Sequence, residues 1–257
     1  MDLGIGNKVA LVTGGSRGLG RHAALSLAKE GVHVAICGRT EATIEKTVKE
    51  LEVFGSKVVG IIADITDPES IKPLLEKSNA ELGPIDILVN NVGGSRGRHP
   101  LETTEEQYRE AFDLNLFGAL RLIQATVPHM QKRQWGRVIN IASIYGREFG
   151  GGASYMAAKA ALIALSKNLA LTLAKDGVLV NSVAPGSISF PGGSWERFQQ
   201  QQPAEVVQEF IKHNLPMGKF GTPEPIGDIV AFLASERAGL ITGACINVDG
   251  GQSHSLI

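Results

Sequence analysis

The sequence predicts an α/β fold: a single domain over residues 1–257, built on a doubly wound parallel sheet of about seven strands with a helical substrate lid. Three observations predict it. Short β-branched runs alternate with longer helical patterns, which is typical of parallel strands joined by helical crossovers. A glycine-rich turn follows the first run, and no linker or internal repeat divides the chain.

Strands are expected over 8–13, 33–37, 58–63, 85–89, 137–142, 179–184 and 245–248, and helices over 19–30, 41–53, 104–130, 155–177 and 226–234. A further helix should begin at Asp67-Pro68-Glu69, with Asp as its cap and Pro at its first position. Gly31 should end the first helix, and Thr104 to Gln107 reads as a capping box.

The stretch 187–220 breaks this alternation. It holds Pro191-Gly192-Gly193 and an amphipathic piece over 204–213. Since it follows the carboxyl end of a parallel strand, where such sheets bind ligands, we interpret it as a substrate lid. A passive insertion is the alternative.

Composition restricts the class of partner. The net charge is −1 without long runs of either sign, so neither nucleic acid nor a membrane surface is expected as partner. No basic-then-apolar leader and no run of about 18 apolar residues occurs, which favours a cytoplasmic protein. The six histidines show no metal-ligand spacing, so no metal is expected. Cys37 and Cys245 lie in apolar runs, typical of buried thiols in a reducing compartment.

Tyr155 and Lys159 are one helical turn apart and should share a face. A phenol titrates near pH 10, and a nearby ammonium favours its ionised form, so the pair suits proton transfer. By itself such a pair is a weak motif, because a tyrosine at a helix start is usually a packed ring.

The stretch Thr13-Gly-Gly-Ser-Arg-Gly-Leu-Gly20 lies between the first strand and the first helix. Gly14, Gly18 and Gly20 allow a tight turn, close approach of the backbone to a pyrophosphate, and close helix packing. The helix N-terminus would then face the phosphates. The glycines are spaced by three residues and then one, whereas the common dinucleotide fingerprint has one and then two.

Further motifs follow in order: Asp64-Ile65, Asn90-Asn91-Val92-Gly93, Asn115, Ser143, Tyr155 with Lys159, Asn181, Pro185-Gly186 and Asn247-Val-Asp-Gly-Gly251. With this set, nearly the whole chain resembles the short-chain dehydrogenase/reductase family, and its pattern is similar to that of 3-oxoacyl carrier-protein reductases. The resemblance implies a Rossmann-like fold, a nicotinamide dinucleotide cofactor and a homo-oligomer, specifically a tetramer.

The resemblance also implies a cofactor site, with Asp64 at the adenine and Asn91 as a support. The expected cofactor-binding residues are Gly14, Ser16, Arg17, Gly18, Leu19, Gly20, Arg39, Asp64, Ile65, Asn91, Gly93, Tyr155, Lys159, Pro185, Gly186 and Ile188. Two positions depart from the family pattern. Val92 replaces the usual Ala, and Phe190 stands where the family often has a Thr that touches the carboxamide.

Charge predicts which dinucleotide binds. An NAD site needs a carboxylate at the end of the second strand for the ribose 2′-hydroxyl, and this chain has Gly38 there. Arg39 and Arg17 could instead hold a 2′-phosphate through charge-assisted hydrogen bonds, so we expect NADP(H) in preference to NAD(H). Two solvated surface arginines are the alternative interpretation.

By resemblance, the reaction is reversible hydride transfer between the nicotinamide and a carbonyl or secondary alcohol. Tyr155 would exchange the proton, Lys159 would lower the tyrosine pKa and bind the ribose, and Ser143 would position the substrate oxygen. Asn115 would hold a water linked to the lysine. Taken alone, Ser143 is equally a strand-end cap and Asn115 a surface amide, and the absence of a Gly-x-Ser-x-Gly elbow argues against a hydrolase.

Three functions are compared. The first is a reductase of 3-oxoacyl thioesters on a carrier, with Arg96, Arg98, His99 and Arg147 around its mouth unless these are merely solvated. The second is a sugar, polyol or steroid dehydrogenase, for which Phe190, Trp195, Phe198 and Phe210 of the lid suggest an apolar pocket. The third, a dinucleotide sensor without catalysis, is disfavoured because the tyrosine, lysine and serine are all present.

Overall fold

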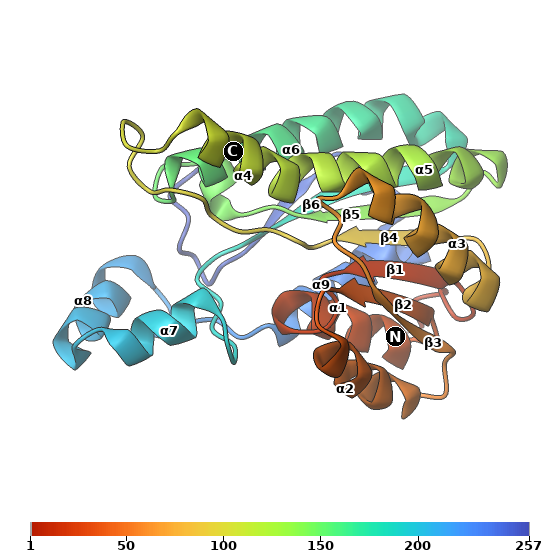
Figure 1. Cartoon of the computed structure of the whole chain (residues 1–257), viewed down its shortest axis with the longest axis horizontal. Helices are drawn as coiled ribbons and strands as arrows, with labels where there is room; N and C mark the ends of the chain where they lie inside the picture. Colours follow the sequence, from red (N-terminus) through yellow and green to blue (C-terminus); the bar gives the residue numbers. More distant parts are fainter. Residues whose placement is uncertain (1, 257) are drawn as a thin grey trace.

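A computed structural model describes residues 2–256; Met1 and Ile257, the ends of the predicted domain, lie outside the described residues. Seven parallel strands form one sheet in the order β3-β2-β1-β4-β5-β6-β7, so the prediction of a doubly wound parallel sheet is confirmed (Figure 1). The strands are β1 Val9–Thr13, β2 His33–Gly38, β3 Val58–Ile62, β4 Ile87–Asn90, β5 Gly136–Ile141, β6 Val178–Pro185 and β7 Cys245–Val248.

Nine α-helices surround this sheet in the described chain: α1 Gly18–Lys29, α2 Glu41–Glu52, α3 Ile71–Leu82, α4 Glu105–Phe112, α5 Gly118–Lys132, α6 Ala153–Leu173, α7 Ser194–Gln201, α8 Ala204–Asn214 and α9 Glu224–Ala234. Helices α1, α2 and α9 cover one face, and α3, α4, α5 and α6 lie on the other (Figure 1). Two helical layers around a parallel sheet bury both of its faces, which explains why its strands read as continuous apolar runs.

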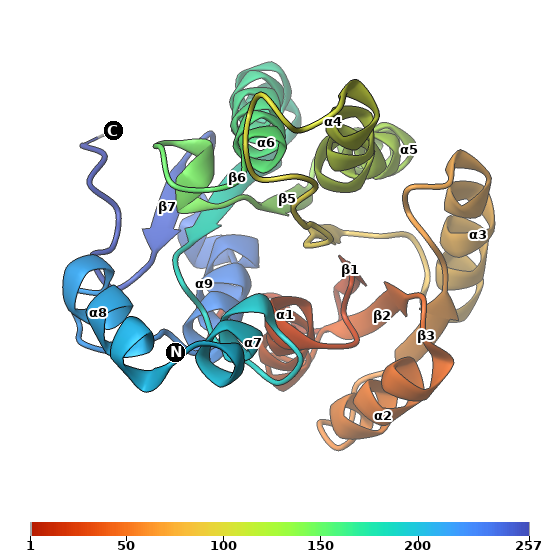
Figure 2. The ribbon, with the colours of Figure 1, turned by 60° about the vertical axis from the view of Figure 1, so that its left-hand side comes forward.

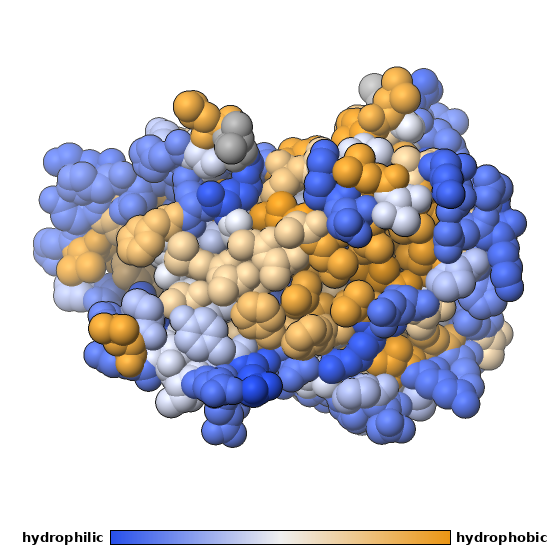
Figure 3. Space-filling model, turned by 90° about the horizontal axis from the view of Figure 1, so that it is seen from above, coloured by the Kyte–Doolittle hydropathy of each residue, from blue (hydrophilic) through white to orange (hydrophobic). Residues whose placement is uncertain are grey.

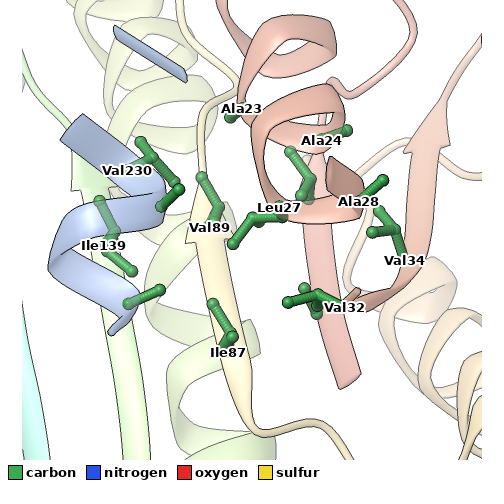
Figure 4. Close-up of a cluster of buried hydrophobic side chains, with 14 of the residues drawn as sticks. Ala23, Ala24, Leu27, Ala28, Val32, Val34, Ile87, Val89, Ile139 and Val230 are labelled. Carbon is green, nitrogen blue, oxygen red and sulfur yellow. The ribbon is translucent and has the colours of Figure 1, made fainter. Parts of the chain in front are cut away.

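Each face of the sheet has its own hydrophobic core. Along β1, Ala10 and Val12 belong to the core under α1 and α9, whereas Leu11 belongs to the core under α3 and α5. This follows from the period of two along a strand. Figure 4 shows the first core, in which Leu27 of α1 and Val230 of α9 approach Val89 of β4.

The predicted helix signals are confirmed. Gly31 follows α1 with φ +77°. The Asp67 carboxylate accepts a hydrogen bond from the Glu69 amide, and Thr104 and Gln107 form both bonds of the capping box. The strong local signals therefore set these helix ends as they do in peptides.

Two predicted helices differ from the structure. The helix expected over 104–130 contains a π-helical turn, Asp113–Phe117, between α4 and α5. The helix expected to reach Gly177 ends at Leu173; a 3₁₀ turn follows, and Gly177 takes φ +70°. Neither irregularity has a signal in hydrophobic periodicity, because the apolar pattern continues through both.

The predicted lid contains α7 and α8, which stand apart from the sheet at one end of the molecule (Figure 1) and come toward the viewer in Figure 2. It leaves the body through a narrow neck, where Ile188 pairs with Gly221 in a parallel bridge. The Ser189 amide donates to the Gly221 carbonyl at 2.9 Å, and the Gly221 amide donates to the Ser187 carbonyl at 3.0 Å.

Among the described residues, the segment Ala153–Asp176 is the one helical stretch whose length and composition would suffice to cross a membrane. It packs along β6 and α4 in the helical layer. Most of this stretch is not buried within the described chain, and we interpret it as a helix of the outer layer whose inner side packs on the sheet.

Candidate active site

The predicted site residues gather at one edge of the sheet. Because all seven strands are parallel, the residues that follow β1, β4, β5 and β6 meet at the carboxyl edge. The glycine turn follows β1, Ser143 follows β5, and Pro185 ends β6. Helix α6 brings Tyr155 and Lys159 to the same edge through contacts with the 3₁₀ turn Ile144–Gly146.

The glycine turn has the backbone that its sequence requires. Gly14 and Gly18 lie in the left-handed region, at φ +61° and +54°. Gly20 is packed against the carbonyl of Gly14 and the side-chain amide of Asn91 without room for a Cβ. The N-terminus of α1, at Gly18, therefore directs its free amides to this edge.

Asn91 fastens the turn to β4. Its backbone amide donates to the Thr13 hydroxyl at 2.9 Å, and its side-chain amide donates to the Thr13 carbonyl at 2.9 Å. The supporting role predicted for Asn91 thus has a concrete form, because its side chain holds the loop that would face a pyrophosphate.

Tyr155, Lys159 and Ser143 lie together. The Lys159 ammonium is 5.7 Å from the centre of the Tyr155 ring and donates to the Ile141 carbonyl at 2.7 Å. The Ser143 hydroxyl is hydrogen-bonded to Tyr155 and also accepts from the Tyr145 amide at 3.1 Å. Ser143 therefore caps the turn after β5, as one interpretation predicts, and contacts the phenol; its contact with a substrate oxygen stays a prediction.

Asn115 lies in the π-helical turn and is buried. Its amide donates to the carbonyls of Gly94 and Ala111, each at 2.8 Å, and its Oδ1 accepts from the Gly94 amide at 3.1 Å. A Cβ on Gly93 would lie 2.8 Å from this Oδ1 and 2.9 Å from the Lys159 ammonium. The alternative of a surface amide is wrong, and Asn115 and Lys159 both approach Gly93.

Burial controls the titration of the pair. It lowers the pKa of Lys159 from 10.5 to about 7. It also raises the pKa of Tyr155, and the hydrogen bond from Ser143 offsets only part of that rise. Lys159 is not among the causes of this shift, so the expectation that Lys159 lowers the tyrosine pKa stays a prediction.

The adenosine end of the expected site is open and polar. Arg17 and Arg39 are both exposed, and the Arg39 guanidinium lies 3.8 Å from the Asp64 carboxylate. Burial raises the pKa of Asp64, but hydrogen bonds from Thr66 and the Arg39 charge outweigh it, so the net pKa is lowered. The Ser16 carbonyl accepts from the Thr47 hydroxyl at 3.0 Å, which fixes the turn beside Gly38.

Three expected cofactor residues have apolar side chains turned toward the protein. Leu19 packs on the first core, Ile188 belongs to it, and Ile65 belongs to the second core and packs against Gly118. Their contribution to a bound cofactor is accordingly limited to their backbones and to shaping the wall.

Sequence reasoning missed Gln252. Its side chain is buried, and its Oε1 accepts a hydrogen bond from the Ser187 amide at 2.7 Å. The same oxygen lies 2.7 Å from where a Cβ on Gly186 would be. The C-terminal segment therefore holds the Pro185-Gly186 loop in place; the residue lies 65 positions from its partner, and no local pattern announces the contact.

The lid aromatics do not form the expected apolar pocket. Trp195, Phe198, Phe210 and Phe220 pack on one another with centroid separations of 4.9 to 6.5 Å, and Phe210 stacks on Phe220. With Val207 and Leu215 they make a small core of the lid itself. Two helices that project from the sheet need such a core, because no other apolar surface covers them.

The positive charge expected around the mouth of the site is also lower than predicted. Arg96 pairs with Glu110 at 3.0 Å, and His99 lies 3.9 Å from Glu102. Arg147 donates to the side-chain oxygen of Asn247 on β7. These partners neutralise or redirect three of the four basic residues named for this role.

Comparisons with known proteins agree with this geometry. A family profile described as enoyl-(acyl carrier protein) reductase matches residues 14–253. The chain is 39% identical to the 3-oxoacyl-[acyl-carrier-protein] reductase FabG of Escherichia coli K12, covering 95% of this chain and 97% of that protein. It is 37% identical to nodulation protein G of Azospirillum brasilense, over 96% and 98% of the two chains.

Solved structures give the same result. L-sorbose reductase from Gluconobacter frateurii, in complex with NADPH and L-sorbose, superposes with a TM-score of 0.90 at 32% identity over the full length of both chains. An actinorhodin polyketide ketoreductase with NADPH also gives 0.90, at 31% identity over 96% of this chain and 98% of that one. With the glycine turn, the tyrosine–lysine pair and these matches in place, the chain belongs to the short-chain dehydrogenase/reductase family, whose members are oxidoreductases.

Proposed function

We propose that the protein is an NADP(H)-dependent reductase that transfers hydride to the ketone of a 3-oxoacyl thioester. The single observation that carries the catalytic part is the Ser143–Tyr155–Lys159 cluster beside the glycine turn. The substrate class rests on relatives named 3-oxoacyl-[acyl-carrier-protein] reductase at 36 to 39% identity. A partner that delivers such a thioester on a carrier protein follows from the same proposal.

The residues present fit an NADP(H) molecule. Gly14 and Gly18 adopt left-handed backbone conformations and carry no Cβ, so a pyrophosphate can approach the backbone of this turn. Because residue 38 is a glycine, no carboxylate stands there to repel a 2′-phosphate. The side chains of Arg17 and Arg39 are exposed and free to turn toward that phosphate. The Arg39–Asp64 pair at 3.8 Å is long and exposed, so breaking it costs little.

Bound NADPH supplies the hydride. The chain supplies the proton and the position of the carbonyl. The raised pKa of Tyr155 keeps the phenol protonated at neutral pH, which is the state required to donate to the developing alkoxide. Ser143, whose hydroxyl lies beside that phenol, is placed to turn its one O–H from the phenol to the same substrate oxygen.

In this proposal, Lys159 and Asn115 help to restore the proton that Tyr155 has donated. With a pKa of about 7, Lys159 gains and loses a proton easily near neutral pH. The Lys159 ammonium and the Asn115 Oδ1 both lie beside Gly93, and two carbonyls fix the Asn115 amide. We propose that Lys159 returns a proton to Tyr155 after each reduction, that the proton comes from solvent through a water held by Asn115, and that the π turn sets the position of Asn115.

A second candidate is a ketose reductase. The full-length match to L-sorbose reductase favours it, at an identity close to that of the polyketide ketoreductase. The same four residues would serve, so the lid decides between the substrates. A steroid alcohol is a further possibility of this class, since a 7α-hydroxysteroid dehydrogenase superposes with a TM-score of 0.89 at 29% identity.

The test is NADPH oxidation at 340 nm with an acetoacetyl thioester, L-sorbose and a 7-oxo steroid, in parallel with NADH. We expect the thioester to give the highest kcat/KM and NADPH to exceed NADH. A higher kcat/KM for L-sorbose than for the thioester would change the proposed substrate class to a ketose and would leave the proposed mechanism unchanged. Turnover with none of the three, although NADPH binds, would contradict both.

We further propose that the protein forms a homo-oligomer, with the tetramer as the expected form, through the face of α5 and α6. Figure 3 shows a broad apolar area on the side of the molecule that these helices cover. Along α6, Ala157, Ala160, Ala164 and Leu171 are exposed at helical spacing. A helix that is apolar on its outer side as well as its inner side is covered in the native state.

Light scattering after gel filtration tests this surface. Leu171 is 72% exposed, and Leu171→Asp should lower the native mass. Val53, 79% exposed after α2, gives the matched control Val53→Asp, which should leave the mass unchanged. An identical mass for both variants would contradict the interface.

The two free thiols, Cys37 and Cys245, also lead us to propose a cytoplasmic location.

A further inference from the structure

The ring of Phe190 lies directly on the glycine turn. A Cβ built on Gly18 would be 2.5 Å from Cε2 and 2.6 Å from Cζ of Phe190, so the ring fills the space that this glycine leaves open. The ring is half-buried and packs on the first core, in which Leu19 of the same turn also takes part. Alone among the aromatic residues of the lid segment 187–220, Phe190 contacts the glycine turn rather than joining the lid core.

Two rigid features place the ring there. On one side is the neck, where Ser189 and Ser187 are bonded to Gly221 and Gln252 holds Ser187. On the other side is a tight turn, Phe190 to Gly193, closed by the Gly193 amide on the Phe190 carbonyl at 2.9 Å. Pro191 and a Gly192 at φ +74° give that turn type II character.

The ring and the pyrophosphate need the same space. In a turn of this kind the glycine at the helix start is there so that the backbone can approach the pyrophosphate closely. A phenyl ring in van der Waals contact with Gly18 excludes a phosphate from that approach. The adenosine end, at Arg39 and Asp64, lies outside its reach because β2 and β3, which carry those residues, are on the far side of β1 from the lid.

We propose that Phe190 blocks the cofactor's own pyrophosphate site and sets the affinity for the dinucleotide, because its ring must leave Gly18 before the cofactor binds. This inference rests on the proposed use of NADP(H). Since the lid helices form a separate core joined to the body through the same neck, displacement of Phe190 also moves the base of the lid. Binding of the dinucleotide is thus coupled to the segment that would receive the substrate.

Calorimetric titration of Phe190→Ala tests the proposal without any turnover. Three ligands separate the regions of the site: NADPH, 2′-phospho-ADP-ribose, and adenosine 2′-monophosphate, which lacks the pyrophosphate. We expect Phe190→Ala to bind the first two about 5-fold more tightly than wild type does, because a larger fraction of the protein is competent to bind. The affinity for adenosine 2′-monophosphate should not change.

Phe198→Ala is the matched control, since it removes a ring of the lid core that does not touch Gly18. It should leave all three affinities within about 2-fold of wild type. If Phe190→Ala unfolds, as judged by circular dichroism, Phe190→Leu removes the ring with less loss of packing and should change the affinities in the same direction.

Each result decides the matter. Unchanged or weaker NADPH binding by the Phe190 variants would overturn the proposal, and so would an equal gain for adenosine 2′-monophosphate. Binding by the variant alone would support it most strongly. If neither wild type nor the variants bind NADPH, the proposed cofactor itself is wrong. That outcome is distinct from one in which all of them bind NADPH with the same affinity, which would overturn only the role of Phe190.

Discussion

The catalytic edge and the lid are built in different ways. At the edge, regular elements hold Tyr155, Lys159 and Asn115, and each side chain has a fixed protein partner. The lid is attached through a short neck and uses most of its aromatic residues to pack on itself. If the proposed function holds, the chemistry would be placed on the rigid body, and selection of the ligand would be left to a segment whose position is held by few contacts.

The first prediction concerns the rigid edge. Tyr155→Phe removes one oxygen and keeps the ring, so kcat should fall by about 10²- to 10⁴-fold, the usual value of a positioned proton donor. The NADPH dissociation constant should stay within about 2-fold. Steady-state rates at 340 nm and calorimetry measure the two quantities. A loss confined to KM would mean that the hydroxyl only binds substrate.

Lys159 should be costly for stability. Burial lowers its pKa from 10.5 to about 7, so the folded protein binds fewer protons than the unfolded chain between these pH values. The free energy of unfolding should therefore rise with pH across that window, and the penalty is complete below pH 7. It corresponds to about 5 kcal/mol as an upper value.

Urea unfolding of Lys159→Met measures this penalty. The variant loses the hydrogen bond to Ile141, worth about 1 kcal/mol, and should still be a few kcal/mol more stable than wild type at pH 6. The difference should shrink toward pH 10, while activity is lost throughout. A variant less stable than wild type at pH 6 would mean that the lysine is not penalised by burial.

The contrast between edge and lid also explains what could be predicted from sequence. Asn91 and Ser143 directly follow strands β4 and β5, and Tyr155 and Lys159 lie in helix α6, so their places along the chain predict where they meet. The alternation of β-branched and helical runs along the chain predicted the parallel sheet, and its seven parallel strands are confirmed.

Other features could not be predicted because they depend on contacts across the fold. Gln252 meets Ser187 across 65 residues, and Phe190 meets Gly18 across the sheet edge. The direction of the Tyr155 pKa depends on burial, which spacing does not report. The inward packing of the lid aromatics follows from the lid standing apart from the sheet.

Arg39 tests the proposed contact with the 2′-phosphate at the adenosine end of the cofactor site. Its guanidinium is 71% exposed and has only a 3.8 Å pair with Asp64. Arg39→Ala should weaken NADPH by about 10-fold, the value of one charge-assisted hydrogen bond, and leave NADH unchanged. Arg109→Ala, which removes an exposed arginine of α4, is the control. Equal losses for both cofactors would show that Arg39 does not read the 2′-phosphate.

An effect of similar size, on stability alone, is expected at the neck. Gln252→Met removes a buried acceptor from the Ser187 amide and should lower the free energy of unfolding by about 1–3 kcal/mol. Gln202→Met, at an exposed lid position, should change it by less than about 0.5 kcal/mol. Thermal and urea unfolding provide the comparison, and equal values for the two variants would show that Gln252 does not anchor the lid.

The most direct measurement follows the hydride itself. Wild-type protein would be incubated with NADPH carrying deuterium at the transferable C4 position and an acetoacetyl thioester, and the product would be examined by mass spectrometry. One deuterium at the carbinol carbon, lost together with turnover in Tyr155→Phe, is the predicted result. Reduced product without deuterium, or with undiminished deuterium transfer in Tyr155→Phe, would contradict the assignment of hydride and proton on which this account depends.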